Sequence, residues 1–313
     1  MMRTVLVTGA SGFVGRQLVP ALRDSGWTVR AACRDPKILE SIDAIETVAL
    51  PDLGEPVDWA PLLDGMTHVV HLAGVAHVPV SEEDARYDRI NTGSVAALGE
   101  AAKAANVQRA VLMSSVRAQV GLSADHPITE ADDPQPTDPY GRSKLAAEAA
   151  LKASGVEYTI LRPAVVYGPG VKGNIASLAS LARTPMPLPF DGLKNRRSLL
   201  AIENLIAAVE LALTDEAARN ETFLVADKDP ISVAGLVSAM REGLGRQPHL
   251  VGMPLGAVKR IMKSFGREAD WDRISGNFMI DSSKLQGIGW DPKIETREGI
   301  MAMMAAEGAT QKL

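Results

Sequence analysis

Cysteine is almost absent from this sequence of 313 residues, in which Cys33 is the only one. A single thiol excludes an internal disulfide and any metal site built from several cysteines. The five histidines show none of the spacings typical of a metal site, so we expect no bound metal. This cysteine usage fits a reducing compartment, and we expect a cytoplasmic protein.

Clustered charge and long hydrophobic runs are also missing. The 33 basic and 38 acidic side chains are spread along the chain and give a net charge of −5. Without a dense basic run, binding to nucleic acid is not expected. The apolar stretch Val5–Val7 is soon followed by Gly9 and Gly12, so it is too short for a signal peptide or a membrane span. The sequence therefore predicts a globular protein with neither nucleic acid nor membrane as a partner.

Short β-branched runs alternate with stretches of helical spacing over the first 165 residues. The runs expected to form strands are Thr4–Thr8, Thr28–Cys33, Glu46–Leu50, His68–Leu72, Ala110–Ser114 and Tyr158–Arg162. Gly15–Ser25 and Asn91–Ala105 are among the stretches with helical spacing between them. Strands separated by helices pair in parallel, and right-handed crossovers then give a doubly wound α/β sheet, the Rossmann fold.

The pattern changes after Pro163. Gly168–Gly170 and Pro185–Pro189 predict loops, and helices are expected near Ile202–Leu213 and Val233–Leu244. We therefore predict a dinucleotide-binding domain over residues 1–165, to which later segments can return. Residues 166–313 would form a smaller, mostly helical lobe that covers the carboxyl edge of the sheet and binds the substrate.

Three glycines punctuate the turn after the first expected strand. Gly9 permits a tight turn, Gly12 lets the backbone approach a pyrophosphate, and Gly15 lets the helix pack on the strand. The helix start then offers free N–H groups to phosphate oxygens. A purely structural turn is the alternative, but the position at the first strand-to-helix junction favours a bound dinucleotide.

The end of the second expected strand bears on which dinucleotide is bound. NAD sites usually place a carboxylate there to hold the ribose 2′-hydroxyl, whereas an arginine suits the 2′-phosphate of NADP. This chain has Cys33 and then Arg34, with Arg16 able to assist, which favours NADP. Asp35 keeps NAD possible.

Tyr140 and Lys144 form the only Tyr-x-x-x-Lys pair in the sequence, and Pro139 places them at the start of a helix. This spacing puts the phenol and the ammonium on one helical face. A phenol titrates near pKa ~10, and a neighbouring ammonium together with a positive nicotinamide ring would lower that value. Ser114 and Ser115 end an expected strand at the edge where such folds bind ligands, and either could hydrogen-bond a substrate oxygen. The alternative is that the two serines only cap a loop.

Taken together, these motifs resemble the extended short-chain dehydrogenase/reductase family, in its nucleotide-sugar epimerase/dehydratase group. The resemblance covers essentially the whole chain and is carried in order by Thr8–Gly15, His71–Gly74, Asn91–Gly93, Ser114-Ser115, Tyr140–Lys144, Leu161–Pro163, Val166–Gly170, Asp281–Leu285 and Gly289–Pro292.

The resemblance implies a role for each matching position. Ser115, Tyr140 and Lys144 would be catalytic, and Asn91 would anchor the active-site helix. Contacts with the cofactor are expected from Gly9, Ser11, Gly12, Phe13, Val14, Gly15, Arg34, Asp52, Leu53, Leu72, Ala73, Gly74, Ser114, Tyr140, Lys144 and Pro163. Contacts with the substrate are expected from Ser115, Asn174, Arg197 and Arg273.

Two departures narrow the expected reaction. A tyrosine usual after the serine pair is replaced by the segment Arg117–Gly121, and no acidic pair typical of a dehydratase follows Ser115. As a whole, the motifs of the chain look most like those of bacterial UDP-sugar 4-ketoreductases and 4-epimerases. This resemblance implies hydride transfer at C4 with NADP or NAD. The alternatives are an NADPH-dependent ketone reductase of a lipid-like or phenolic substrate, or a non-catalytic cofactor-binding subunit. Alanine-rich helices such as Asn91–Ala105 and Tyr140–Ser154 often pair across a two-fold axis in the family that the chain resembles, which implies a homodimer. Packing of such helices inside a monomer is the alternative.

Overall fold

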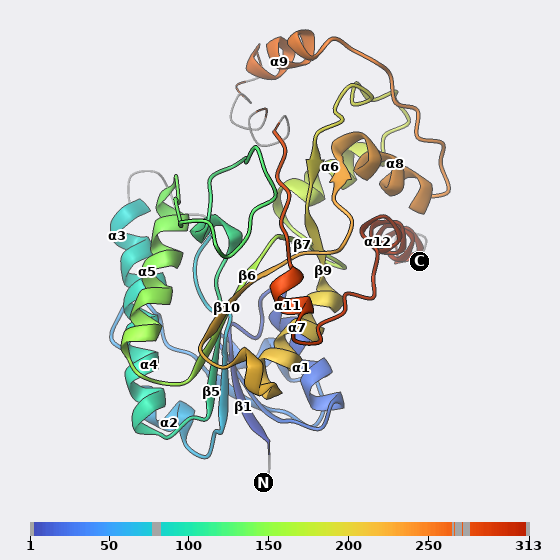
Figure 1. The fold of residues 1–313 in the computed structure, drawn as a ribbon. Helices are drawn as coiled ribbons and strands as arrows, with labels where there is room; N and C mark the ends of the chain where they lie inside the picture. Colours follow the sequence, from blue (N-terminus) through green and yellow to red (C-terminus); the bar gives the residue numbers. More distant parts are fainter. Residues whose placement is uncertain (1–2, 77–82, 265, 267–270, 272–275, 311–313) are drawn as a thin grey trace.

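The computed structural model describes residues 3–76, 83–264, 266, 271 and 276–310. Its central feature is a parallel sheet of seven described strands in the order β10-β6-β5-β4-β1-β2-β3 (Figure 1). These strands are β1 (Thr4–Thr8), β2 (Thr28–Cys33), β3 (Glu46–Ala49), β4 (His68–His71), β5 (Arg109–Met113), β6 (Tyr158–Pro163) and β10 (Glu221–Val225). The predicted doubly wound α/β fold is confirmed.

Six of these strands lie where the sequence predicts them, and β10 was not predicted. It comes 57 residues after β6 ends and pairs beside it in parallel, with Phe223 opposite Leu161. Its short run Glu-Thr-Phe-Leu-Val follows a long helix and carries no turn motif, so nothing local marks it as a sheet strand. The seventh strand therefore returns to the sheet from the second half of the chain.

Helices connect the strands and build the rest of the second half. Those that flank the sheet are α1 (Gly15–Asp24), α2 (Ala60–Leu63), α3 (Glu83–Tyr87), α4 (Ser94–Ala104), α5 (Pro139–Ala153) and α7 (Ile202–Thr214). The remaining helices are α6 (Gly173–Ala182), α8 (Val233–Gly243), α9 (Leu255–Ser264), α11 (Ser283–Gln286) and α12 (Thr296–Thr310). Single turns at Pro36–Leu39, Val116–Ala118 and Glu216–Ala218 are 3-10 helices, called η1, η4 and η5, and Asp88–Gly93 forms a π-helical segment, η3.

The alternation of side chains along each strand divides the core into two layers. In β1, Val5 and Val7 join the cluster with α1 and α7, whereas Leu6 joins the cluster with α2, α4 and α5. Figure 1 shows these two sets of helices on opposite sides of the sheet. Because both faces are covered, strands in the middle of the sheet, such as β1 and β5, are buried along their whole length, as is usual for parallel sheets.

The second half of the chain forms a further cluster above the sheet. Tyr167 of β7 (Val165–Tyr167) packs there with β9 (Leu199–Ala201) and with α6, α8 and α12. A second small sheet pairs β8 (Arg196–Arg197) with β11 (Ile231–Ser232). Among the described residues, no helix combines the length and the apolar character needed to cross a membrane.

One buried carboxylate ties this cluster to the end of β10. Asp227 accepts hydrogen bonds from the hydroxyl of Tyr167 (3.0 Å), from Nδ2 of Asn204 (2.7 Å), from the amide of Ala201 (3.0 Å) and from the hydroxyl of Thr296 (3.2 Å). A buried charge is tolerated when such donors satisfy it. The helical part is thereby joined to the sheet through four separate segments of the chain.

Candidate active site at the carboxyl edge of the sheet

The glycine turn between β1 and α1 is as tight as its sequence predicts. Gly9 has a φ of +69°, and a Cβ atom there would lie 2.8 Å from the amide nitrogen of Ala73. At Gly15 a Cβ atom would lie 2.5 Å from the carbonyl oxygen of Gly9, so the helix packs directly on the turn. Gly12 is exposed, and no described side chain caps the start of α1.

The other predicted residues of this turn follow the same path. Ser11, Phe13 and Val14 are partly exposed, and Val14 is the N-cap residue of α1. Arg16 donates from Nε to the carbonyl oxygen of Ser11 (2.9 Å), which braces the turn. The exposed backbone thus lies at the positive end of a helix, where phosphate oxygens bind readily.

The end of β4 lies against this turn. His71 is 3% exposed, and its Nδ1 lies 2.9 Å from the hydroxyl of Thr8. Burial, and then the charge of Lys144, lower the pKa of His71 to about 3, so its imidazole is neutral at pH 7. The amide of Ala73 also donates to the hydroxyl of Thr8 (3.3 Å), and Leu72 is partly buried beside the same core. The neutral ring of His71 therefore ties β4 to β1 through the hydroxyl of Thr8.

Asn91 links the loop after β4 to the helix that carries Tyr140. It accepts from the amide of Val75 (2.9 Å), donates to the carbonyl oxygen of Val75 (3.0 Å) and donates to the hydroxyl of Ser143 (3.0 Å). A Cβ atom at Gly74 would lie 2.9 Å from Oδ1 of Asn91. This close approach requires glycine and places the loop over α5.

Tyr140 lies in the first turn of α5, as predicted. The helix begins at Pro139, and the side chain of Asp138 caps it by accepting from the amide of Gly141 (2.6 Å). The side chain of Ser115, which follows the end of β5, interacts with the phenol of Tyr140 and lowers its pKa. Residues 25 positions apart in the sequence therefore meet through their reactive oxygens.

The ionisation of Tyr140 differs from the expectation. Burial is the main cause that raises its pKa to about 12, and the hydrogen bond from Ser115 and the charge of Arg117 lower it only partly. Tyr87, whose ring centroid lies 6.0 Å away, and Asp138 raise it further. The groups of the chain itself therefore make the phenol less acidic, whereas the sequence predicted a lowered value.

Lys144 lies one helical turn beyond Tyr140 and is 7% exposed. Its ammonium donates to the carbonyl oxygen of Met113 (3.0 Å), and a Cβ atom at Gly74 would lie 3.6 Å from Nζ. Burial lowers the pKa of Lys144 to about 8, and the charge of Glu148 opposes this shift. The amine is thus held between the end of β5 and the loop after β4.

The hydroxyl of Ser114 has a different partner from the hydroxyl of Ser115. It donates to Glu148, which also forms a buried ion pair with Arg162 at 2.6 Å. Arg162 in turn contacts the side chain of Gln119. Since this hydroxyl donates its proton to Glu148, the predicted contact of Ser114 with a cofactor would use the backbone or the hydroxyl oxygen as an acceptor.

The residues predicted to contact the adenosine end of the dinucleotide lie at the ends of β2 and β3. Arg34 and Asp52 are exposed, and Leu53 is partly buried. Asp52 accepts from the amide of Gly54 (2.9 Å), and Asp35 accepts from the amide of Lys37 (3.2 Å). Within the described residues, Arg34 makes no hydrogen bond or ion pair, so its guanidinium can turn toward a ligand. Pro163, at the end of β6, is buried opposite Val225.

The predicted substrate residues lie in the second half of the chain. Asn174 is exposed in the first turn of α6. Arg197 of β8 donates to the carbonyl oxygens of Gly276 (3.0 Å) and Leu122 (3.3 Å), and burial is the main cause that lowers its pKa to about 10. Arg273 lies outside the described residues.

Arg117 was singled out in the sequence only as a departure from the family pattern. Its amide donates to the hydroxyl of Ser115 (3.1 Å), and its guanidinium pairs with Asp138. Its charge acts on both Tyr140 and Arg197. The signal in the sequence was an arginine two residues after the serine pair, but the pairing with Asp138 needed the structure.

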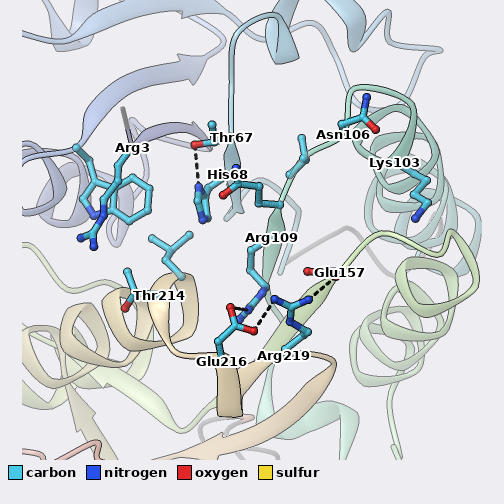
Figure 2. A pocket seen from close by; sticks show the side chains of 14 residues that line it. Arg3, Thr67, His68, Lys103, Asn106, Arg109, Glu157, Thr214, Glu216 and Arg219 are labelled. Carbon is cyan, nitrogen blue, oxygen red and sulfur yellow. Dashed lines mark hydrogen bonds and ion pairs between the residues drawn. The ribbon is translucent and has the colours of Figure 1, made fainter. Parts of the chain in front are cut away.

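A cavity of about 760 Å³ lies at the opposite, amino edge of the sheet (Figure 2). It is lined by His68 at the start of β4, by Arg109 at the start of β5, and by Glu157, Glu216 and Arg219. None of the predicted catalytic or cofactor-binding residues lines it. The charged side chains that line the cavity are largely paired, since Arg219 contacts Glu157 (2.6 Å) and Glu216 (2.5 Å). We therefore do not regard the cavity as the active site. Among the described residues, no cluster of side chains suits a metal ion.

Comparison with known proteins identifies the class. The sequence model of the NAD dependent epimerase/dehydratase family matches residues 5–226. The chain therefore belongs to the NAD dependent epimerase/dehydratase family and is an enzyme of the extended short-chain dehydrogenase/reductase type. The predicted family, fold class and assignment as an enzyme are confirmed.

Individual relatives extend the match over nearly the whole chain. A UDP-glucose 4-epimerase of Vibrio cholerae is 33% identical over 311 residues, which cover 96% of this chain and 94% of the relative. MoeE5, solved in complex with UDP-glucose and NAD, superposes with a TM-score of 0.77 at 27% identity over 99% of each chain. A ceramide reductase of Caulobacter vibrioides is 32% identical over 204 residues, which cover 65% of this chain and 58% of that protein.

Proposed function

We propose that the chain binds a nicotinamide dinucleotide and transfers a hydride at C4 of a UDP-linked hexose, as a 4-epimerase or a 4-ketoreductase. The observation that carries the proposal is the interaction of Tyr140 with Ser115 at the edge that also holds Lys144 and the glycine turn. A proton-transferring phenol, a polarising hydroxyl and a buried amine are the groups that oxidation of a secondary alcohol requires.

The residues of the first turn fit a dinucleotide. The uncapped start of α1 and the exposed Gly12 offer backbone amides to a pyrophosphate, and the tight contacts of Gly9 and Gly15 bring the backbone close. Leu72, Ala73 and Gly74 would border the cofactor on the neighbouring strand end. A bound nicotinamide supplies the hydride acceptor and, when oxidised, a positive charge near the phenol.

Each catalytic side chain then has one task. Ser115 would donate to the sugar oxygen at C4 and hold it beside the phenol of Tyr140. Tyr140 would take the proton of the C4 hydroxyl as the hydride leaves and return it on reduction. Lys144, fixed by the carbonyl oxygen of Met113, would hold the nicotinamide ribose and stabilise the phenolate. Asn91 would anchor α5 through Ser143.

The lobe formed by residues 166–313 would bind the UDP moiety. Arg197 is partly buried and contacts only carbonyl oxygens and the ring of Phe278 within the described residues, so a diphosphate could supply the anionic partner that it lacks. Asn174 and Arg273 would complete this contact. The V. cholerae relative named UDP-glucose 4-epimerase and the complex of MoeE5 with UDP-glucose support this substrate class.

A Tyr140→Phe variant tests the proposal. We expect turnover of UDP-glucose or a related UDP-hexose to fall by about 10²–10⁴-fold, because the proton acceptor is lost. Binding of the nicotinamide dinucleotide, measured by calorimetry, should change less than threefold (about 0.7 kcal/mol) because the ribose contact of Lys144 remains. Full turnover by the variant would refute the assignment.

Retention of the cofactor separates the two reactions. An epimerase returns the hydride to the same sugar and keeps its dinucleotide through the cycle, whereas a reductase must exchange it. Absorbance of the protein-bound dinucleotide after extended dialysis distinguishes them. A retained cofactor together with interconversion of C4 isomers identifies an epimerase.

Arg34 bears on the choice of dinucleotide. A preference for NADP rests on this exposed guanidinium and on the lack of a carboxylate at Cys33, with Arg16 able to assist, while the family description and the MoeE5 complex name NAD. If Arg34 binds a 2′-phosphate, Arg34→Ala should raise the Kd of NADP about tenfold and leave that of NAD unchanged. Equal effects on both cofactors would remove the preference.

A lipid-like ketone is the second candidate substrate, and the similarity to the C. vibrioides ceramide reductase favours it. UDP and UDP-sugars should raise the melting temperature if the first candidate is right, because ligands that bind only the folded state stabilise it. No shift with uridine nucleotides, and reduction of a long-chain ketone, would favour the second. A protein that turns over neither class would be a non-catalytic subunit.

A homodimer and a cytoplasmic location complete the proposal. Helices α4 and α5 pack against each other on one face of the sheet, and pairing of these helices between two copies would bury their outer sides (Figure 1). Sedimentation at micromolar concentration would show whether the chain is a dimer.

A further inference from the structure

Two segments of the chain meet beside Ser115 and Tyr140. The turn η4 follows Ser115 directly, and Asp138 precedes the first residue of α5. The carbonyl oxygen of Arg117 in η4 approaches the start of α5 so closely that a Cβ atom at Gly141 would lie 2.3 Å from it. Only glycine leaves room for this contact, so the two backbones are held together.

Arg117 contacts Ser115 in its own segment through its backbone and Asp138 in the other segment through its side chain. Its amide donates to the hydroxyl of Ser115 (3.1 Å), and its guanidinium donates to Oδ2 of Asp138. The other carboxylate oxygen of Asp138 accepts from the amide of Gly141 (2.6 Å) and caps the helix that carries Tyr140. Together with the interaction of Ser115 with the phenol of Tyr140, these contacts link Ser115, Asp138 and the start of α5.

We propose that Arg117 is a positioning residue that, through Asp138 and through its own amide, holds Ser115 and Tyr140 in register for one substrate oxygen. The inference rests on the proposed function and adds a residue to it. Arg117 acts through its neighbours, and its contact with Asp138 also balances the charge beside the phenol.

Stability alone does not explain an arginine at this position. Nη1 of Arg117 is buried and has no hydrogen-bond partner within the described residues, which costs free energy. The guanidinium also acts on the like charge of Arg197. A single ion pair with the partly exposed Asp138 does not offset such costs by much. A role in the active site explains why position 117 carries a charged side chain that lowers the stability of the fold.

Charges of both signs face Tyr140. Asp138 raises the pKa of the phenol and Arg117 lowers it, while Tyr87 packs at 6.0 Å and Lys144 lies one turn along α5. Removing the charge of Arg117 or of Asp138 leaves the charge of the other residue unbalanced beside the phenol. Arg117→Gln should therefore raise the pKa of Tyr140, and Asp138→Asn should lower it. Asparagine remains a good N-cap, so the second variant keeps the helix start.

The first measurement needs no substrate. Ionisation of Tyr140 is followed by tyrosinate absorbance in the protein saturated with NAD, as the difference between each variant and the same variant carrying Tyr140→Phe. We expect the midpoint to move up by about half a pH unit in Arg117→Gln and down by a similar amount in Asp138→Asn. Arg117→Lys keeps the charge and should stay at the wild-type midpoint. Shifts in the same direction, or none, would overturn the proposal.

The second measurement is turnover of a UDP-hexose. Arg117→Gln and Arg117→Lys should each lower kcat about tenfold with an unchanged KM for the sugar nucleotide, because the contact between the guanidinium and Asp138 is lost. Lys103→Gln, which removes a cation from the amino edge shown in Figure 2, is the matched control and should leave kcat unchanged. A change in KM alone would contradict a positioning role. If the wild-type protein turns over no UDP-hexose, the proposed function fails, and the tyrosinate midpoints still decide the role of Arg117.

Discussion

The two ends of the central sheet carry similar side chains in different settings. Strand β4 begins with His68 and ends with His71, and burial is the main cause that lowers the pKa of the first to about 4 and of the second to about 3. Each edge also holds a buried cation, Arg109 at the amino edge and Lys144 at the carboxyl edge.

The surroundings of the two cations differ. Nη1 of Arg109 donates to the carbonyl oxygens of Ala212 (3.1 Å) and Asp215 (3.1 Å), and its guanidinium also faces Glu216 at 3.9 Å (Figure 2). Lys144 donates to a single carbonyl oxygen and its pKa is lowered by burial. A cation with many acceptors holds segments together, whereas a buried amine with few acceptors is typical of a reactive site.

The largest expected effect is at the carboxyl edge. Lys144→Met should lower turnover about 10³-fold, because the phenolate and the nicotinamide ribose lose their ammonium. The free energy of unfolding should stay within about 1 kcal/mol, since removing a poorly paired buried charge costs little. Steady-state kinetics and urea denaturation measure the two quantities. A large loss of stability without loss of turnover in Lys144→Met would contradict the proposed difference between the two edges of the sheet.

The converse change at the amino edge is Arg109→Met. It should lower the free energy of unfolding by about 3 kcal/mol, because buried carbonyl oxygens of α7 and η5 lose their donor. Turnover per folded molecule should stay within about twofold, since the two edges are at opposite ends of the strands. Arg219→Met, whose side chain is 40% exposed, is the control and should cost less than about 1 kcal/mol.

The smallest effect concerns the pH dependence of stability. Unfolded His68 binds a proton below pH 6.5, but the folded protein binds it only near pH 4, so this histidine lowers stability as the pH falls through that interval. His68→Gln should reduce the loss of Tm between pH 7 and pH 4.5 by about 3 °C. His126, which is exposed beside Asp125 and Asp132, has a raised pKa and contributes in the opposite sense. His126→Gln should therefore not reduce that loss, and calorimetry at the two pH values would show whether it does.

Local patterns were sufficient for most of the fold and for the start of the site. The start of α5 at Pro139 follows from proline after the capping residue Asp138, and the contact of Gly15 with the backbone of Gly9 follows from their spacing. Each of these features depends on residues close together in the sequence.

The features that escaped prediction depend on packing between distant segments. Ser114 and Ser115 are neighbours, but the structure directs one hydroxyl to Glu148 and the other to Tyr140. Arg117 and Asp138 meet only when η4 packs on α5. The raised pKa of Tyr140 also has burial as its main cause, which a spacing argument cannot measure.

The position of β10 limits where the chain can be cut to give a fragment that folds. The chain leaves the sheet after β6 and comes back in the strand next to it, so everything between them is inserted at one sheet edge. A fragment that stopped at residue 165 would leave open the side of β6 that pairs with β10 and would uncover the apolar surface under α7. Open edges and exposed apolar surface of this kind recruit other chains, so we expect such a fragment to aggregate, while one that continues through β10 would keep β6 paired on both sides and α7 in place.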